Sequence, residues 1–166
     1  METDKDLAGD VLTIKIFNPN NASHPQFNVV NRPPNSSKHD NEKLFDQLSY
    51  SASSCTNTII LGDLNLQDHW DRGAPLNSFS ASFFNFFHDC GLHQNVTSPT
   101  HKNNFLDVVL SSADIVPSVA IFPALGSSDH NIVCFEISED FSNVVPLSDF
   151  RMIDYSCPDV NLSIVD

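Results

Sequence analysis

A short apolar segment, Ile59-Ile60-Leu61, constrains the possible folds of this chain more than any other stretch of its sequence. A strand that has no polar face must be covered on both sides, which is typical of a sheet buried between layers. We therefore expect residues 57–61 to form a buried central strand. Gly62 and Asp63 follow it directly and are expected to end it, because both residue types favour turns.

Hydrophobic patterning along the rest of the chain predicts a mixture of strands and helices. The expected strands are residues 11–17, 26–31, 105–110, 118–122 and 132–137, and the expected helices are residues 37–55 and 77–90. Ser37 or Asp40 could cap the first helix, and Gly91 could close the second. Residues 68–75 are expected to form a loop. The resulting order, β-β-α-β-α-β-β-β, indicates an α/β class with layered sheets.

The chain is strongly acidic, with 8 Lys and Arg against 21 Asp and Glu and a formal net charge of -13. No Lys or Arg lies between Asn103 and Phe150. This balance argues against passive nucleic-acid binding, which rests on basic side chains that meet phosphates. It is compatible with a metal-dependent nuclease, because acidic residues that hold Mg²⁺ can invert the local charge. We expect weak DNA affinity for the chain by itself.

Neither the cysteines nor the first residues point to secretion. The 4 cysteines form no CxxC pair and no obvious disulfide framework, so buried free thiols are expected. Residues 1–10 are acidic and polar, so we expect them to be disordered and expect no signal peptide. No apolar run approaches membrane-spanning length. The expectation is a cytoplasmic or nuclear protein that is not secreted and has no membrane partner.

Three short segments carry residue types that can do chemistry, and each adjoins a predicted strand. In the first, Asp63 and Asn65 follow the apolar strand. Side chains at positions i and i+2 point the same way from an extended chain, so both would face one site at the edge of a sheet. A simple turn is the alternative, because Gly, Asp and Asn are all turn formers.

The second and third segments carry an aspartate and a histidine. Asp107 lies within the apolar stretch 105–110, where a carboxylate is costly to bury unless it is paired. It could orient a histidine, or it could face solvent on an edge strand. His130, beside Asp129, leads into the stretch 132–137. An imidazole can exchange protons near neutral pH, although each of the 7 histidines could equally be a surface residue.

Taken together, three motifs resemble those of the endonuclease/exonuclease/phosphatase superfamily. They are GDLN at residues 62–65, LDVVL at 106–110 and SSDH at 127–130. Pro99-Thr100-His101 and the Arg-Pro-Pro segment after Asn31 resemble the branch of non-LTR retrotransposon endonucleases. The resemblance implies an α/β fold that is a partial four-layer α/β sandwich of this type, with the first half missing.

The resemblance also assigns catalytic roles. Asp63 and Asn65 match the pair that positions the attacking water and a phosphate oxygen. His130 matches the catalytic histidine, and Asp107 matches the aspartate that holds it.

Metal and substrate contacts are implied in the same way. The implied metal is Mg²⁺, or Mn²⁺ in its place, which would polarise a phosphoryl oxygen and stabilise the leaving oxyanion. Its implied ligands are Asp63, Asn65 and Asp129. Asn31 and Thr100 are implied to lie near the nucleic-acid backbone.

The resemblance runs from Val11 to Tyr155 and divides the chain into parts. Residues 11–138 would form the partial endonuclease domain. Residues 139–166 would be a linker toward a reverse transcriptase domain in a parent polyprotein. DNA is the implied substrate.

The sequence departs from the family pattern in ways that support a second hypothesis. The family's early Asn and its metal-binding Glu have no counterpart before Val11, and Asn31 replaces the tyrosine that precedes Arg-Pro-Pro in the family. Removing one well-placed electrostatic group typically costs about 10²–10³ in rate. The leading hypothesis is a metal-dependent, DNA-nicking endonuclease domain, truncated and weak or inactive alone. The alternative is a non-catalytic relic or interaction module of a decayed retrotransposon frame.

Two other chemistries have less support from the sequence. A serine hydrolase could use Ser127 or Ser128 with His130, but no G-x-S-x-G elbow is present. A zinc site could be sought in three residues whose spacing matches no standard ligand pattern, His88, Cys90 and His93.

Overall fold

The structure is a computed structural model that describes residues 10–16, 25–65, 78–112 and 114–138. The described residues form two helices, α1 (Lys38–Ser54) and α2 (Ser78–Asp89), and seven strands. The strands are β1 (Asp10–Lys15), β2 (Gln26–Asn31), β3 (Thr58–Asp63), β4 (His93–Gln94), β5 (Asp107–Ser111), β6 (Val119–Phe122) and β7 (Ile132–Phe135). The predicted order of strands and helices is confirmed, with β4 as an addition.

Several expectations fall on parts of the chain outside the described residues. These are the loop over residues 68–75, the linker over residues 139–166 and the disorder of residues 1–10, of which only Asp10 is described. They stay predictions, except that Asp10 is the first residue of β1, so the expected disorder is wrong there. Cys134 is exposed, so the prediction of a buried thiol is wrong for it. Among the described residues, no helix is both long enough and apolar enough to cross a membrane.

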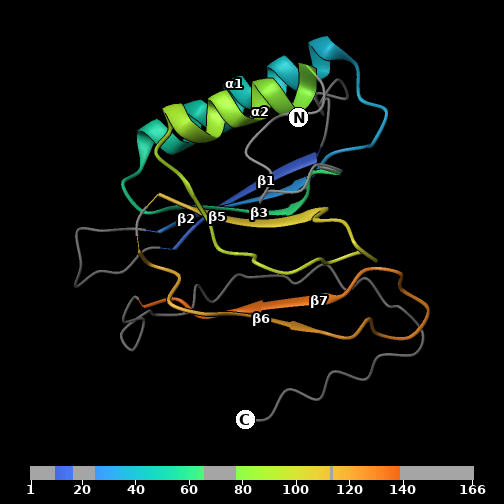
Figure 1. Ribbon diagram of the computed structural model, residues 1–166. Coiled ribbons are helices and arrows are strands. Elements are labelled where there is room, and N and C mark those ends of the chain that lie inside the picture. The colour runs from blue at the N-terminus through green and yellow to red at the C-terminus, as the bar shows by residue number, and fades with distance from the viewer. Residues whose placement is uncertain (1–9, 17–24, 66–77, 113, 139–166) are drawn as a thin grey trace, which may run out of the picture.

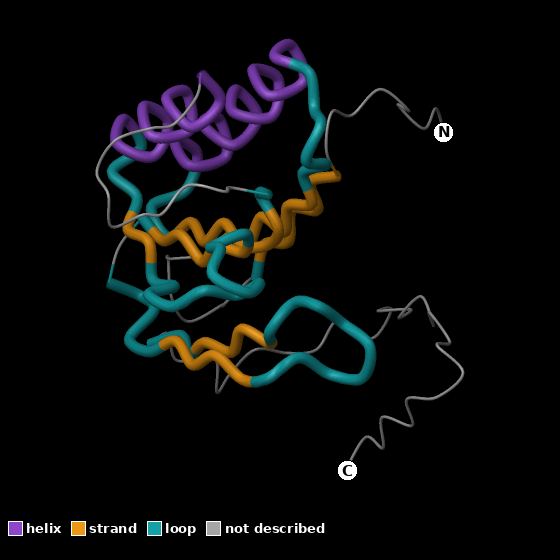
Figure 2. Tube along the Cα trace, turned by 45° about the vertical axis from the view of Figure 1, so that its right-hand side comes forward, coloured by secondary structure: helices purple, strands orange, loops and turns teal. Residues whose placement is uncertain are grey.

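The helices and strands form three stacked layers (Figures 1 and 2). The middle layer is a five-stranded sheet in the order β1-β2-β3-β5-β4. Both helices lie side by side on one face of this sheet, and the antiparallel pair β6-β7 lies across the other face. The predicted α/β class and the partial layered sandwich are therefore confirmed.

β3 is the central strand, as its apolar sequence predicts. It runs parallel to β2 and antiparallel to β5. Ile59 and Ile60 are both fully buried. Ile60 packs in the core beneath the helices, and Ile59 packs in the core between the two sheets. Because successive side chains of a strand point to opposite faces, a strand between two layers is apolar throughout.

Phenylalanine side chains fill the layer between the helices and the sheet. Phe45 of α1 stacks on Phe79 and Phe86 of α2, and the ring centroids are 5.6 Å apart in each pair. Phe83 is fully buried beside them. Complete burial of one such side chain contributes about 1.5–3 kcal/mol. This aromatic packing fixes the two helices over the sheet.

The local signals at the helix ends are also confirmed. Ser37 is the N-cap of α1 and forms a reciprocal capping box with Asp40. Gly91 follows α2 with a φ of 59°, in the left-handed region that ends many helices. Its N–H donates to the carbonyl oxygen of His88 at 3.0 Å.

The predicted strand boundaries differ from the structure where tertiary pairing extends or shortens a strand. β3 continues through Gly62 to Asp63, because these residues pair with β2 and β5. β5 begins at Asp107 rather than at residue 105. β4 has only two residues and exists through its pairing with β5, so local periodicity in the sequence could not predict it.

The second sheet covers only part of the first. Leu12 of β1 pairs with Val29 of β2, which pairs with Leu61 in the core between the sheets. Yet Leu12 and Val29 are 59% and 36% exposed. On β6, Phe122 is 50% exposed. Exposed apolar surface of this kind is expected of a partial sandwich.

Gly62 is the one position in β3 where no other residue fits. Its φ is 130°, a conformation that L side chains rarely adopt, and a Cβ placed there would lie 2.0 Å from the carbonyl oxygen of Val30. The obstacle is backbone of the paired strand β2, so a flexible side chain cannot move aside to relieve it. The close approach of β2 and β3 beside the strand end therefore depends on this glycine.

We predict that Gly62→Ala lowers the free energy of unfolding by about 3 kcal/mol or more, since strain at positive φ adds to overpacking. Gly91→Ala is the matched control, because Gly91 also has a positive φ but has no atom near its would-be Cβ. The control should cost only about 1 kcal/mol. Urea denaturation followed by circular dichroism measures both. Equal effects of the two substitutions would contradict the steric argument.

Candidate active site

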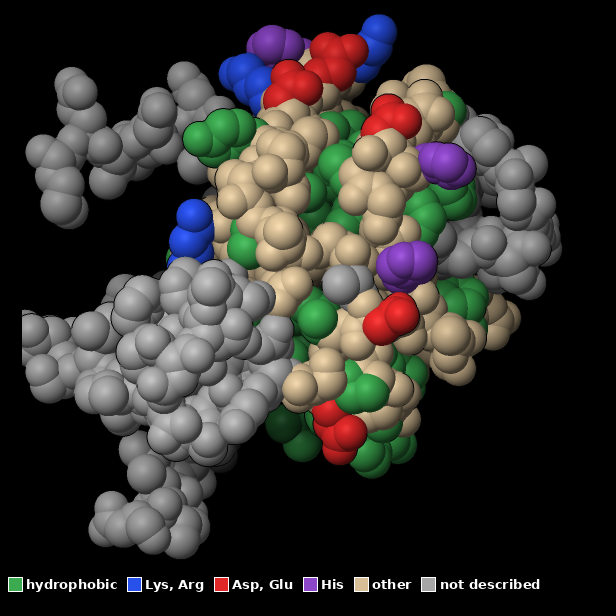
Figure 3. Space-filling view, turned by 90° about the vertical axis from the view of Figure 1, so that its left-hand side faces the viewer, with side chains coloured by type: hydrophobic (Ala, Val, Ile, Leu, Met, Phe, Trp, Pro, Cys, Tyr) green, Lys and Arg blue, Asp and Glu red, His purple; other side chains and the backbone are tan. Residues whose placement is uncertain are grey.

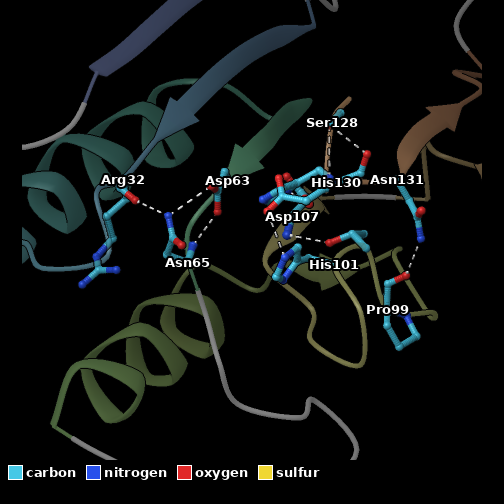
Figure 4. Close-up of polar contacts among 11 residues, drawn as sticks. Arg32, Asp63, Asn65, Pro99, His101, Asp107, Ser128, His130 and Asn131 are labelled. Atoms are coloured by element: carbon cyan, nitrogen blue, oxygen red, sulfur yellow. Dashed lines mark hydrogen bonds and ion pairs between the residues drawn. The ribbon is translucent and has the colours of Figure 1, made fainter. Parts of the chain in front are cut away.

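The ends of three adjacent strands bring the predicted residues to one edge of the five-stranded sheet. Asp63, the last residue of β3, pairs with Asp107, the first residue of β5. Asn31, the last residue of β2, pairs with Asp63 from the other side. All three lie at the same end because β2 is parallel and β5 antiparallel to β3. Figure 4 shows Asn65 and His130 beside this pair of aspartates.

Asp63 and Asn65 are held together by a tight turn rather than by an extended strand. Asn65 has a φ of 51°, in the left-handed region. Its backbone N–H donates to Oδ1 of Asp63 at 2.8 Å, and its Nδ2 donates to Oδ2 of Asp63 at 3.0 Å. The two side chains lie next to each other as predicted, but the prediction that they do so from an extended strand is wrong. A turn joins them, which was the alternative interpretation of this segment.

His130 and Asp107 form the second half of the site. Nδ1 of His130 lies 2.9 Å from Oδ2 of Asp107, and 30% and 20% of the two side chains are exposed. A carboxylate at this nitrogen fixes both the orientation and the tautomer of an imidazole. β5 lies between β3 and β4, so the alternative that placed Asp107 on an edge strand is wrong.

The segment before β7 that carries His130 is anchored to the segment before β5. The backbone N–H of Asn131 donates to the carbonyl oxygen of Thr100 at 2.7 Å. Nδ2 of Asn131 donates to the carbonyl oxygen of Pro99 at 3.4 Å (Figure 4). Oγ of Ser128 accepts the backbone N–H of His130 at 3.1 Å. These contacts hold the imidazole toward Asp107, although Asp107 begins a strand of the five-stranded sheet and His130 precedes a strand of the other sheet.

The two residues implied to lie near nucleic acid differ in exposure. Asn31 is exposed at the end of β2. Thr100 is fully buried, and its Oγ1 accepts the backbone N–H of Asp107 at 3.1 Å. The Thr100 hydroxyl therefore fixes the first residue of β5 and is not presented to solvent.

Asp129, the third implied metal ligand, interacts with histidines. Its Oδ2 lies 3.2 Å from Nε2 of His101, and its side chain is 76% exposed. Among the described residues, no three His, Cys, Asp or Glu side chains gather closely enough to hold a metal ion together. Asp129 therefore does not complete an acidic three-residue cluster with Asp63 and Asp107.

Arg32 lies next to the site and contacts the turn that carries Asn65. The sequence alone did not identify it as a site residue. Its side chain is buried. Nε donates to Oδ1 of Asn41 at 2.7 Å and Nη1 donates to the carbonyl oxygen of Leu64 at 3.1 Å. The guanidinium lies 3.6 Å from the ring centroid of Phe79, a cation–π contact. A lone arginine between an apolar strand and two prolines was the signal that could have identified it.

Burial and neighbouring charges shift the protonation of the site. Burial raises the pKa of Asp63 above its ordinary value, and the charge of Asp107 raises it further, against the hydrogen bonds of Asn65 and the charge of His130. Burial alone would lower the pKa of His130. The hydrogen bond and charge of Asp107, with the charges of Asp63 and Asp129, outweigh it and raise that pKa.

The donor chemistry fits a magnesium ion held by few protein ligands. Mg²⁺ prefers oxygen donors and commonly uses one or two carboxylates, completed by water and phosphate. Asp63 provides a carboxylate, and the amide of Asn65, whose Nδ2 donates to Asp63, carries a further oxygen donor. The repulsion from Asp107, which helps to raise the pKa of Asp63, would be relieved by a nearby cation.

The geometry disfavours the two other chemistries. A serine nucleophile would be hydrogen-bonded to the imidazole of its base. Oγ of Ser128 instead bonds to the backbone N–H and carbonyl oxygen of His130. His88, Cys90 and His93 form no metal-binding group among the residues that the structure describes.

A layered α/β sandwich with an Asp–His pair beside an Asp–Asn turn at one sheet edge is the arrangement expected of the endonuclease/exonuclease/phosphatase class. Residues 19–134 match the endonuclease-reverse transcriptase family. The match spans more than half of the chain, so the chain belongs to this family. None of the curated proteins compared with the chain matches it.

Two solved structures share the fold. One is the endonuclease domain of TRAS1, a telomere-specific non-LTR retrotransposon, with a TM-score of 0.62 and 18% identity over 81% of this chain and 71% of that chain. The other is the 3′ phosphatase NExo from Neisseria bound to a product DNA hairpin, with a TM-score of 0.55 and 15% identity over 69% of this chain and 62% of that chain. At these identities the likeness concerns the fold alone. Together with the family match, it confirms the resemblance that the motifs indicated.

We predict that Arg32→Lys lowers the free energy of unfolding by about 2–3 kcal/mol. A lysine cannot make both hydrogen bonds and also stack on Phe79, and the buried acceptors would lose their donor. Urea denaturation measures the loss. In a double-mutant cycle with Asn41→Ala the two losses should be strongly non-additive. Simple addition of the two would show that the Arg32–Asn41 contact carries no stability.

We predict that Asp107→Asn lowers the pKa of His130 in the metal-free protein. A raised folded-state pKa means that His130 adds stability below its ordinary pKa of 6.5, and that this stability is lost as pH rises through the folded-state pKa. Replacing Asp107 removes the largest of the interactions that raise it. NMR titration of the imidazole resonances measures the shift, with exposed His88 as the internal control. An unchanged midpoint for His130 would refute the pairing.

Proposed function

We propose that this chain is a Mg²⁺-dependent phosphodiesterase domain that nicks DNA. The observation that carries the proposal is the 2.9 Å contact between His130 and Asp107 directly beside the Asp63–Asn65 turn. Asp63 ends β3 and Asn65 follows it, whereas Asp107 begins β5 and His130 precedes β7. Three parts of the chain that are distant in sequence therefore supply the four side chains. Because these side chains meet at one edge of the five-stranded sheet, acid–base groups and oxygen donors for a metal lie next to one another.

Asp63 is suited to accept a proton from an attacking water. Its raised pKa, caused first by burial, makes its carboxylate a stronger base than that of an exposed aspartate. Asn65 donates to both carboxylate oxygens and so fixes their direction. A fixed, partly desolvated carboxylate orients a water molecule for attack on phosphorus.

His130 is suited to meet the negative charge of the phosphate. Its pKa is raised by Asp107, Asp63 and Asp129 despite burial, so its protonated form persists to higher pH than that of an ordinary histidine. A protonated imidazole can donate to a non-bridging oxygen and stabilise charge that develops in the transition state. Asp107 holds the ring in place and compensates its charge.

Mg²⁺, when bound, would polarise a phosphoryl oxygen and stabilise the leaving oxyanion. Asp63 and the amide oxygen of Asn65 would hold it, and Asp129 stays a further candidate ligand. Mn²⁺ could take its place, since it accepts the same oxygen donors.

DNA is the proposed substrate, in line with the family to which the chain belongs. On the face that Figure 3 shows, Lys and Arg side chains are few and separated. Next to the site, Lys102 is the exposed basic residue in the described turn after His101. We therefore expect weak DNA binding by the chain alone. We further propose a reverse transcriptase domain as its partner in a parent polyprotein, and a cytoplasmic or nuclear location.

A non-catalytic role is the second candidate. The observation that favours it is the site itself, because no three acidic, His or Cys side chains among the described residues converge as a metal cluster. Asn31 also stands where the family tyrosine was expected, exposed at the end of β2. Such a remnant would keep the fold and lack turnover.

We predict that the wild-type chain nicks supercoiled plasmid with Mg²⁺ and that His130→Ala lowers the rate by about 10²–10³, the cost of losing one electrostatic group in the site. Gel analysis of nicked product against time measures the rate. Chelation of Mg²⁺ should abolish it.

His88→Ala is the matched control, because His88 is exposed in the last turn of α2, at the end of that helix away from Phe79 and Arg32. It should nick as fast as the wild type. Equal rates for wild type and His130→Ala in pure preparations would eliminate the nuclease proposal. A cooperative thermal melt without any nicking would support the non-catalytic candidate instead.

A further inference from the structure

A second histidine, His101, lies directly against the Asp–His pair. Its ring centroid is 5.1 Å from that of His130, with 32° between the two rings. Its Nε2 lies 3.2 Å from Oδ2 of Asp129, and only 15% of its side chain is exposed. Figure 4 shows it on the segment before β5, facing the segment that carries His130. His101 therefore touches two residues of the site at once.

The backbone around His101 is held in place by short-range hydrogen bonds. The N–H of Asn104 donates to the carbonyl oxygen of His101 at 2.8 Å, and the N–H groups of Thr100 and His101 both donate to the carbonyl oxygen of Asn104. This turn also receives the backbone N–H of Asn131 at Thr100. His101 thus projects from a rigid support toward the segment that holds Asp129 and His130.

We propose that His101 is a positioning residue of the active site: it directs the Asp129 carboxylate and limits the tilt of the His130 ring. The proposal rests on the proposed function only for its effect on catalysis. Asp129 is exposed and has no sheet hydrogen bonds to orient it. The imidazole of His101 is a buried, fixed partner for it, and partners of this kind orient ligating carboxylates.

The contacts of the two ring nitrogens define how His101 acts. Nε2 faces a carboxylate, so it must carry the proton and donate. Nδ1 is buried and has no hydrogen-bond partner. A glutamine places an amide N–H₂ near the position of Nε2, whereas an asparagine reaches only as far as Nδ1. Glutamine should therefore keep the contact with Asp129, and asparagine should lose it.

The test compares His101→Gln and His101→Asn in the full chain, with His88→Asn as a control for an exposed histidine. The first readout is the set of His130 imidazole resonances in ¹⁵N-histidine-labelled, metal-free protein. The second is Mn²⁺ affinity by calorimetry. The third is the nicking rate, resolved into kcat and KM. Thermal melts confirm that each variant is folded.

We expect His101→Asn to shift the His130 resonances, to weaken Mn²⁺ binding by about tenfold and to lower kcat by a similar factor with little change in KM. His101→Gln should restore each value to within about threefold of the wild type. Asp129→Ala removes the carboxylate, and with it the same contact, from an exposed position. If His101 acts through that carboxylate, adding His101→Asn to Asp129→Ala should cost no more than Asp129→Ala alone.

Two results would overturn the proposal. One is a His101→Asn variant whose His130 resonances and Mn²⁺ affinity equal those of the wild type. The other is simple addition of the His101→Asn and Asp129→Ala effects. Failure of the nuclease proposal is a separate outcome: if no variant nicks DNA, the His130 resonances in metal-free protein still decide whether His101 positions that ring.

Discussion

The pairing of β3 with β2 on one side and β5 on the other is the constraint on which the rest of the structure depends. It sets Asp63 opposite Asp107, and it requires glycine at residue 62, where a Cβ would meet the carbonyl oxygen of Val30. A shift of register by one residue would turn every side chain of a strand to the other face. Because only a glycine fits opposite Val30, Gly62 fixes the register of β3, and that register places the aspartates.

The site concentrates charge in a place that is only partly open to water. Burial and the neighbouring Asp107 raise the pKa of Asp63, and the hydrogen bonds of Asn65 and the charge of His130 oppose that rise. Arg32 is buried, and its desolvation is offset by hydrogen bonds and by stacking on Phe79. Arg32 thus links the aromatic core beneath the helices to the site, because its Nη1 donates to the carbonyl oxygen of Leu64, which lies between Asp63 and Asn65 in the chain.

The extent to which sequence predicted this structure differs by residue. The buried β3 and the helix caps at Ser37 and Gly91 follow from local patterns and are confirmed. The two-residue β4 could not be predicted, because it exists only through its pairing with β5. The nearness of Asp63 and Asn65 was predicted, but the left-handed turn that produces it was not. Arg32 and His101 stood in segments that resemble the family but were assigned no role, because nothing local marks a basic residue as enclosed beside a site.

By itself, the sequence determined which segments are strands and helices, which faces are apolar, and, through GDLN, LDVVL and SSDH, the family to which the chain belongs. These properties depend on neighbours along the chain and on motif order. The motifs also implied that Asp107 holds His130, and the structure shows that contact. Only the tertiary structure decided that Thr100 is buried and that His101 lies against both Asp129 and His130. Those contacts join segments whose distance is set by strand register and by the docking of one sheet on the other, and neither leaves a trace in local periodicity.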